Sequence, residues 1–273
     1  MSTIPFGHHE LHNRYLFEGT LVPETALRLS SGRASDETDA PLMRDRSGVP
    51  YLPGSSLRGA IRSEVERVIA GVGEDVAGIK TCILFCDGDC NSEAREFQQT
   101  EAFQESTDKE IALAEFAKNN LCDVCKLLGC TIYASRLGIE DAYPRNKDSL
   151  KSRNMIRDGV GIDRDTGAAR EGVKFNYEVL EAGSGSNNAE FCLRMRAENV
   201  TEPDRKLIDL ILCLLKRGLY VGGKRAAGLG RIRLKDDYTV KGFESPQALW
   251  QAIMDGTDPH QKINWKEVED AQT

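Results

Sequence analysis

Two clusters of cysteines give the clearest indication of a metal-binding site in this sequence. Three cysteines fall between residues 82 and 90, and three more between residues 122 and 130. The spacing Cys122-x-x-Cys125 is typical of half of a structural zinc site, which needs four tetrahedral ligands. The other cluster is the natural source of the remaining two ligands, although the spacing leaves open which cysteines complete the site. The candidate ligands are Cys82, Cys86, Cys122 and Cys125, with Cys90 and Cys130 as alternatives.

The expected cellular location favours metal binding over disulfide bonds for these cysteines. No run of apolar residues approaches the roughly 20 needed to cross a bilayer. The first residues lack the basic segment and apolar stretch of a secretory signal. We therefore expect a cytoplasmic protein, in which stable disulfides are rare.

The distribution of charge allows an RNA-binding face on an acidic protein. The net charge of −7 alone argues against nucleic acid, because contacts with phosphate require lysine and arginine. However, residues 213–235 hold seven basic residues and no acidic residue. Residues 145–174 hold eight basic and five acidic residues. These segments predict a basic surface, and the alternative is that they are ordinary solvated charges.

A glycine-rich loop lies inside the first of these basic segments, in the sequence VGGKRAAGLG. Gly222 and Gly223 would let the backbone approach a sugar–phosphate chain closely, and Lys224 and Arg225 would supply positive charge. The loop does not match the Walker A pattern. The alternative is a tight turn between a helix and a strand.

A second candidate phosphate site lies at the start of an expected helix. Ser55 or Ser56 is predicted to cap this helix, because apolar residues recur after them at helical spacing. Arg58 and Arg62 are four residues apart, so they share one face near the N-terminus of the helix, which favours bound anions. The alternative is that both are surface arginines.

The elements around these residues predict an α+β fold with a ferredoxin-like core, the topology of the RNA-recognition motif. Residues 15–29 read as a strand broken by Pro23, and Pro203 is placed to begin a helix that ends before Gly218. Alternating residues predict a β-hairpin between residues 173–180 and 190–196. We expect one domain over residues 1–273, with an inserted cysteine-rich and acidic region at 71–128 that contains one helix over about residues 92–120.

Four segments in order resemble a known protein family. The first, DAPLMRDRSGVPYLPGSSLRGAIR, spans residues 39–62, and the second, CDVCKLLG, spans residues 122–129. The third, GVGIDRDTGAAREGVKFNYEVL, spans residues 159–180, and the fourth, VGGKRAAGLGRIRL, spans residues 221–234. Together they are similar to the RAMP-superfamily backbone subunits of type III CRISPR effector complexes. The acidic helical insertion and the cysteines between residues 82 and 90 are not general features of that family.

The resemblance implies a subunit that binds CRISPR guide RNA and complementary single-stranded target RNA. It also implies head-to-tail packing with other CRISPR-associated subunits. In the family, an aspartate just before the P-x-x-R-D element supports metal-dependent cleavage of the target. Here that residue is Asp39, with Asp36 and Glu37 as nearby rivals, and cleavage would require Mg²⁺ or another divalent ion. The resemblance further implies that residues 145–190 contain a protruding thumb hairpin that binds RNA through Arg153, Arg157 and Arg164.

Three other interpretations remain open from the sequence. The chain could be a structural subunit of the same kind without activity. It could be a guide-processing endoribonuclease of the same superfamily, although that class often uses a histidine and the histidines here lie only near the two ends of the chain. It could also be an unrelated zinc-stabilised binding module.

Overall fold

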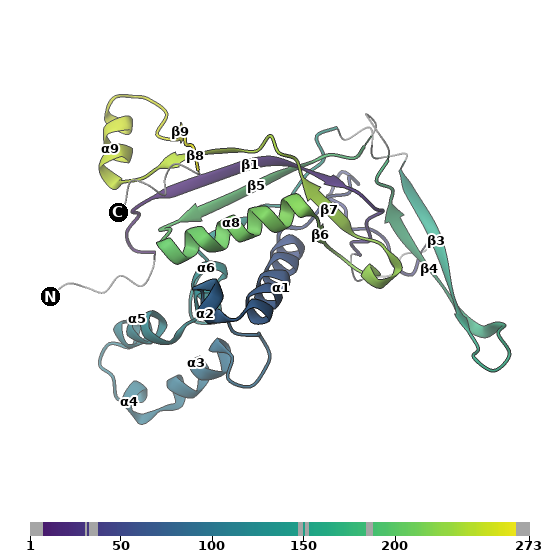
Figure 1. The fold of residues 1–273 in the computed structure, drawn as a ribbon, viewed down its shortest axis with the longest axis horizontal. Coiled ribbons are helices and arrows are strands. Elements are labelled where there is room, and N and C mark those ends of the chain that lie inside the picture. Colours follow the sequence, from purple (N-terminus) through teal and green to yellow (C-terminus); the bar gives the residue numbers. More distant parts are fainter. Residues whose placement is uncertain are drawn as a thin grey trace.

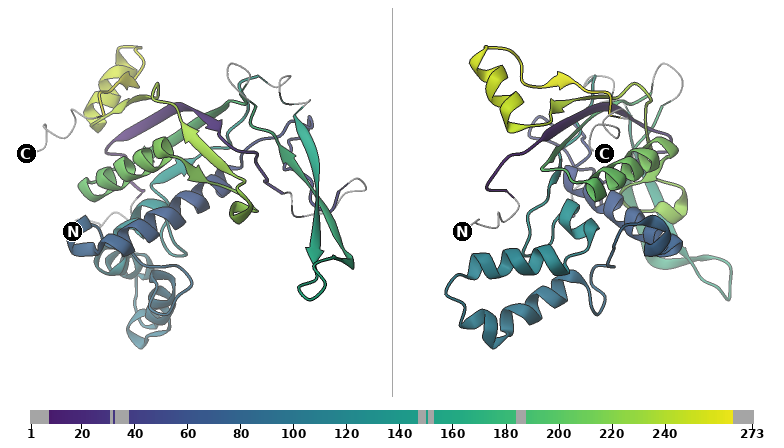
Figure 2. Two further views of the ribbon diagram at one scale, coloured as in Figure 1. Left: turned by 45° about the vertical axis from the view of Figure 1, so that its right-hand side comes forward. Right: turned by 60° about the vertical axis from the view of Figure 1, so that its left-hand side comes forward.

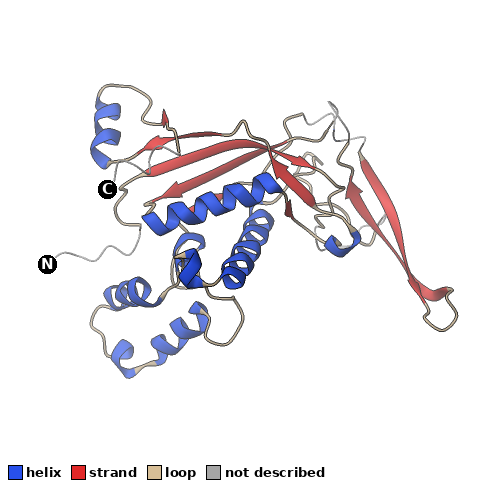
Figure 3. Ribbon diagram, viewed as in Figure 1, coloured by secondary structure: helices blue, strands red, loops and turns tan. Residues whose placement is uncertain are grey.

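One antiparallel sheet organises the structure, with two long helices packed against one of its faces (Figures 1 and 3). The computed structural model describes residues 8–30, 32, 38–146, 150, 153–183 and 188–265. The strands are β1 (Arg14–Pro23), β2 (Leu137–Ile139), β3 (Asn154–Ile162), β4 (Ala169–Leu180), β5 (Phe191–Glu198), β6 (Leu219–Tyr220), β7 (Arg231–Leu234), β8 (Thr239–Phe243) and β9 (Gln261–Lys262).

Most helices form two groups, one on the sheet and one in a lobe beside it, and the last helix lies apart from both, next to the C-terminal strands (Figure 1). None of the helices in the described part of the chain has both the length and the apolar character needed to cross a membrane. They are α1 (Gly54–Val72), α2 (Glu74–Ala77), α3 (Cys90–Gln99), α4 (Glu101–Gln104), α5 (Lys109–Asn120), α6 (Asp123–Leu128), α8 (Glu202–Arg217), the 3₁₀ turn η2 (Arg225–Ala227) and α9 (Pro246–Met254).

The core has the predicted ferredoxin-like arrangement. The elements β1, α1, β2, β5, α8 and β7 follow the order β-α-β-β-α-β along the chain. The strands lie in the order β2-β5-β1-β7, and every neighbouring pair is antiparallel. Two such helices cover one face of a four-stranded sheet in this topology. The strands β6, β8 and β9 extend the sheet beyond this core.

The helix α8 shows why the core forms from this sequence. Its first turn contains Pro203, and the backbone N–H of Thr201 donates to the Asp204 carboxylate at 2.9 Å. It ends at Gly218, whose φ of 106° lies in the region that favours glycine. An apolar stripe on one side of α8 is buried against the sheet, which confirms the predicted helix. The stripe consists of Leu207, Ile208, Ile211, Leu212 and Leu215.

The helix α1 begins slightly earlier than the predicted serine cap. Its N-cap is Pro53, so Ser55 and Ser56 lie in the first turn. The backbone N–H of Gly54 donates to Oδ1 of Asp141 at 2.7 Å. A carboxylate from elsewhere in the chain therefore satisfies one of the free donors at this helix end.

The predicted hairpin between residues 173–180 and 190–196 is wrong in its pairing. The strand β4 pairs with β3, in register Asn154↔Leu180, whereas β5 pairs with β1 along its length. Side chains of β5 alternate between buried and exposed, which suits a sheet with one covered face. The β3–β4 hairpin is largely exposed, and it projects away from the sheet (Figures 1 and 2).

The acidic region between the cysteine clusters forms a separate helical lobe (Figure 2). Instead of the single predicted helix, it contains α3, α4 and α5. Thr100 is extended and its side chain accepts a hydrogen bond from Phe103 N, which starts α4. Asp108 likewise caps α5. Threonine and aspartate compete for backbone hydrogen bonds in this way and interrupt helices.

The C-terminal segment completes the hydrophobic core. Trp265 packs edge-on against Tyr15 and Phe17 of β1, with ring centroids 5.0 Å apart in both cases. Its indole N–H donates to Oδ1 of Asp209 on α8 at 2.6 Å. A residue outside any recognisable motif therefore joins the sheet to the helix that covers it.

Candidate functional site

Asp39 lies beside the projecting hairpin and is exposed. Its backbone N–H donates to Oδ1 of Asn176 at 2.9 Å, and the backbone N–H of Asn176 donates to Oδ2 of Asp39 at 2.9 Å. The backbone N–H of Glu178 also donates to the carbonyl of Ala40 at 3.1 Å. The loop is therefore attached to the free edge of β4. The rivals Asp36 and Glu37 lie outside the described residues.

The glycine-rich loop contacts the same strand. Lys224 has a left-handed backbone, with φ of 59°. Its ammonium lies 4.4 Å from the ring centroid of Phe175 and 5.5 Å from that of Tyr177. These aromatic residues flank Asn176 in β4, so the partners of Asp39 and of Lys224 are consecutive along one strand. The alternation of aromatic residues around Asn176 is a signal that the sequence analysis missed.

The first two glycines of this loop pack closely against another segment of the same chain. A Cβ on Gly222 would lie 2.3 Å from the carbonyl oxygen of Arg28, and its φ is 77°. The backbone N–H of Gly223 donates to the same carbonyl at 2.9 Å. Gly222 therefore allows the loop to pack on the segment after β1. Lys224 and Arg225 are exposed beyond this contact.

The hairpin arginines occupy different environments. Arg157 pairs with Glu181 at 2.7 Å near the base of the hairpin, and Arg153 donates to the carbonyl of Ala182 at 3.3 Å. Arg164 is exposed in the turn at the tip. Apolar side chains are also exposed along the hairpin, which is the composition of a surface that contacts another molecule. They are Met155, Ile156, Val160, Ile162 and Val173.

A pocket of about 600 Å³ opens beside the first turns of α1. Its wall consists of residues of α1, of Leu84 and of the segment after α6, namely Ser55, Arg58, Gly59, Arg62, Leu84, Gly129, Cys130, Thr131, Tyr133, Ala134 and Ser135. Arg58 donates to the carbonyl of Leu128, and its Nε is buried without a hydrogen-bond partner among the described residues. Burial and the neighbouring Arg62 lower the pKa of the Arg58 guanidinium. An anion in this pocket would favour the charged form of Arg58 and so oppose the lowered pKa.

Arg62 does not share the exposure predicted for it. It is 8% exposed, because its side chain turns toward the cysteine cluster. Its guanidinium donates to Glu66 Oε1 at 2.7 Å, to the carbonyl of Gly129 at 2.7 Å and to Cys125 Sγ at 2.9 Å. These bonds use Arg62 within the fold, so we assign it a structural role.

Four cysteines meet in one compact group that fits a metal ion. Their sulfur atoms all lie within 4.8 Å of one another. The sulfur of Cys82 is 3.6 Å from that of Cys125 and 3.7 Å from that of Cys122. Zinc with four thiolates at about 2.3 Å would separate the sulfurs by about 3.8 Å. The group is compatible with zinc, and its members are Cys82, Cys90, Cys122 and Cys125.

Cys90 takes the place that was predicted for Cys86. Cys90 is the first residue of α3, and Asp89 caps that helix by accepting from Ser92 N at 2.7 Å. This cap turns Cys90 inward, where its sulfur accepts from Cys122 N at 3.3 Å. Cys86 lies on the loop before the cap and is exposed. Hydrogen bonds from the Cys122 and Cys125 thiols lower the pKa of Cys82, so the group favours thiolate at that position.

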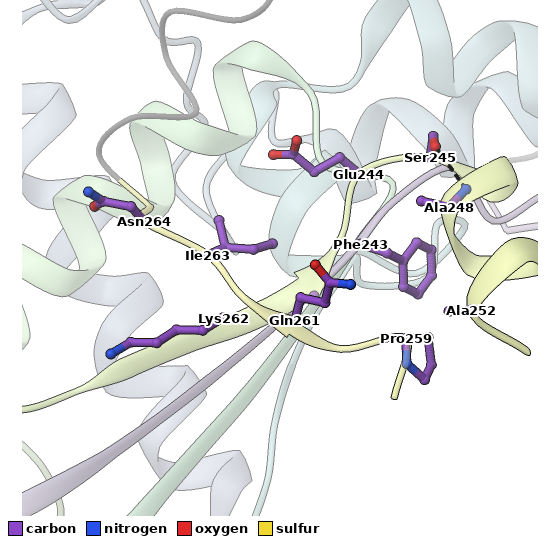
Figure 4. A pocket seen from close by; sticks show the side chains of 11 residues that line it. Phe243, Glu244, Ser245, Ala248, Ala252, Pro259, Gln261, Lys262, Ile263 and Asn264 are labelled. Atoms are coloured by element: carbon purple, nitrogen blue, oxygen red, sulfur yellow. Dashed lines mark hydrogen bonds between the residues drawn. The ribbon is translucent and has the colours of Figure 1, made fainter. Parts of the chain in front are cut away.

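Another pocket, of about 480 Å³, lies between β8, α9 and β9 (Figure 4). Phe243, Glu244 and Gln261 are among its lining residues. Ser245 beside it accepts a hydrogen bond from Ala248 N at 3.1 Å and so begins α9. None of the candidate catalytic, RNA-binding or metal-binding residues lines this pocket, so it is not part of the candidate site.

Comparisons with known proteins agree with the fold. A family model described as the RAMP superfamily matches residues 20–233. A protein of Methanocaldococcus jannaschii named CRISPR system Cms endoribonuclease Csm3 is 25% identical over 238 residues. The match covers 83% of this chain and 80% of that relative. The matched range contains Asp39, the cysteine group, the hairpin and the glycine-rich loop. The chain belongs to the RAMP superfamily.

Proposed function

We propose that this chain is a guide-RNA-binding backbone subunit of a type III CRISPR interference complex. It binds complementary single-stranded target RNA and cleaves that RNA as a metal-dependent endoribonuclease. Membership of the RAMP superfamily supports the proposal, as does the similarity to a relative that is named a CRISPR endoribonuclease.

The convergence of Asp39 and the basic loop on β4 carries the proposal. Asn176 holds Asp39, and the flanking Phe175 and Tyr177 contact Lys224. Asp39 contacts Asn176 and Lys224 contacts the rings on either side of it, so a reactive carboxylate and a phosphate-binding charge both lie along this part of β4. This arrangement suits a strand of RNA that runs along the base of the hairpin.

The chemistry proposed for Asp39 follows from its exposure. Attack of a 2′-hydroxyl on the adjacent phosphate requires in-line geometry and a group that accepts or stabilises charge. The Asp39 carboxylate is fixed at Oδ2 by Asn176 and remains exposed. It is therefore placed to orient the RNA and to accept a proton or ligate a divalent ion. Mg²⁺ bound there would stabilise negative charge on the phosphate oxygens.

The residues proposed to bind RNA lie on three parts of the molecule. Ser55, Ser56 and Arg58 line or adjoin the pocket at α1. Lys224 and Arg225, with Gly222 and Gly223, form the basic loop. Phosphate contacts of this kind fix the register of RNA without reading its sequence. The hairpin contributes Arg153, Arg157 and Arg164.

We also propose a structural zinc ion on the four clustered cysteines. It would join the loop before α3 to α6, two segments separated by the helical lobe. Neighbouring subunits are proposed to pack head to tail along the guide, and the complex is proposed to act in the cytoplasm.

A catalytically inactive backbone subunit is the second candidate function. The hydrogen bond from Asn176 to the Asp39 carboxylate favours it, because a carboxylate that only fixes a loop makes this type of contact. Both candidates share the same RNA-binding surface, and they differ in whether the target is cut.

Guide-RNA binding tests the shared part of the proposal. The affinity of the purified chain for guide RNA is measured at several salt concentrations, for wild type, Lys224→Ala and Lys262→Ala. Lys262 is an exposed control on β9, at the other end of the sheet (Figure 1). Lys224→Ala should weaken binding and reduce the slope of log K against log salt by about 1. Equal affinity and slope for all three proteins would remove the basic loop from the interface.

A further inference from the structure

One face of α1 is directed at the cysteine group. Arg58, Arg62 and Glu66 follow one another at intervals of four residues, so they share that face. The side chains of Arg62 and Glu66 are 10% and 9% exposed and form an ion pair of 2.7 Å between Nε and Oε1. A buried ion pair requires further hydrogen bonds to offset its loss of hydration. Those hydrogen bonds lead to the cysteines.

Arg62 and Glu66 face different parts of the cysteine group. Arg62 Nη2 donates to Cys125 Sγ at 2.9 Å, and Arg62 Nη1 donates to the carbonyl of Gly129 at 2.7 Å. Burial raises the pKa of the Glu66 carboxyl, and the backbone of Leu84, which lies between Cys82 and Cys90, is close enough to Glu66 to oppose this larger effect by lowering the pKa. The pair therefore connects both halves of the cysteine group to the helix at the centre of the core.

The charge of a four-cysteine metal site explains why an arginine belongs there. Four thiolates around a divalent ion carry a net charge of −2, which is unfavourable in a buried position. A guanidinium bonded to one sulfur offsets part of this charge and fixes the orientation of that ligand. Hydrogen-bond partners of ligands contribute to metal affinity in this way.

We propose that Arg62 is the outer hydrogen-bond donor of this metal site and sets its affinity through the bond to Cys125. The inference rests on the proposed zinc site. Arg62 also lines the pocket proposed to bind RNA, together with Arg58 and with Gly129, whose carbonyl accepts a hydrogen bond from Arg62. Arg62 therefore contacts both the cysteine group and the wall of that pocket.

The test compares zinc affinity between matched variants of the full-length chain. Glu66→Gln serves as the background, because removal of Arg62 alone would leave a buried carboxylate unpaired. Arg62→Met in this background removes the bond to Cys125. The control is Arg67→Met with Glu64→Gln, which removes an exposed ion pair of the same helix. Competition with a chromophoric chelator gives the affinity, and elemental analysis gives the zinc content.

We expect Arg62→Met with Glu66→Gln to bind zinc roughly 10-fold to 100-fold more weakly than Glu66→Gln alone. The control should remain close to wild type. Equal affinity with and without Arg62, in proteins that contain zinc, would overturn the role of Arg62 and leave the zinc site intact. A wild-type chain that binds no zinc would instead overturn the site itself.

A spectroscopic readout covers the case in which the methionine variant does not fold. Co²⁺ replaces zinc in the wild type and in Arg62→Lys, which keeps the charge but loses the planar donor group. Loss of a hydrogen bond to Cys125 should shift the thiolate-to-cobalt charge-transfer band. Identical bands and identical Co²⁺ affinities in the two proteins would contradict the proposal.

Discussion

Asp39 and Asn176 exchange two hydrogen bonds of 2.9 Å beside the base of the β3–β4 hairpin. One bond runs from the Asp39 backbone to the Asn176 side chain, and the other runs from the Asn176 backbone to the Asp39 carboxylate. The position of the proposed catalytic carboxylate is therefore tied to the hairpin proposed to contact RNA. Movement of the hairpin would carry Asp39 with it.

The first prediction concerns Asn176 as the residue that positions Asp39. Asn176→Ala removes the acceptor for the Asp39 backbone and should lower target cleavage roughly 10-fold to 100-fold, because small displacements of a reacting group are costly. Target binding should be retained. The control is Asp158→Ala, which removes an exposed carboxylate opposite Asn176 in β3. Cleavage by Asn176→Ala at the wild-type rate would show that this contact does not position the active group.

The second prediction separates two cysteines that lie four residues apart. Cys90→Ser should lose bound zinc and lower the melting temperature, because Cys90 belongs to the four-sulfur group. Cys86→Ser should keep both properties, because Cys86 is exposed and outside that group. Zinc content by elemental analysis and thermal unfolding measure the effect. Loss of zinc in Cys86→Ser together with retention in Cys90→Ser would reverse this assignment.

The third prediction uses the two tryptophans of the chain. Trp265 is 6% exposed and packs on Tyr15 and Phe17, whereas Trp250 on α9 is 64% exposed. Trp265→Ala should reduce the free energy of unfolding by about 3–5 kcal/mol. Trp250→Ala should change it by less than about 0.5 kcal/mol. Urea denaturation followed by circular dichroism measures both variants. Similar stabilities would mean that the C-terminal segment contributes little to the core.

Local signals in the sequence predicted the elements of the core. Pro203 and Gly218 mark the start and end of α8, and the stripe between them has the helical period. The CxxC spacing identified Cys122 and Cys125 as members of the group that could hold a metal. The order of strands and helices was sufficient to predict the ferredoxin-like class.

Features that depend on distant contacts were not predictable in the same way. The turn-like sequence between β4 and β5 favoured pairing of these two strands, but β4 pairs with β3 in an exposed hairpin and β5 pairs with β1 and β2 in the main sheet. The helical period places Arg62 on the same face as Arg58, but only the cysteine group, brought near by the fold, explains why that arginine is buried. The capping of α3 by Asp89, rather than spacing alone, decides that Cys90 turns inward.

Cleavage of target RNA by the assembled complex is the most direct test of the proposed function. Wild type, Asp39→Ala and Asp39→Asn are each assembled with guide RNA and mixed with complementary target, with and without Mg²⁺. We expect wild type to cut at a fixed position only with Mg²⁺. Both variants should bind the target and lose that cut, because a general acid–base group or metal ligand contributes about 10²–10⁴-fold to rate. If the same cut persists in Asp39→Ala, or if wild type never cuts there, the chemistry assigned to Asp39 is contradicted.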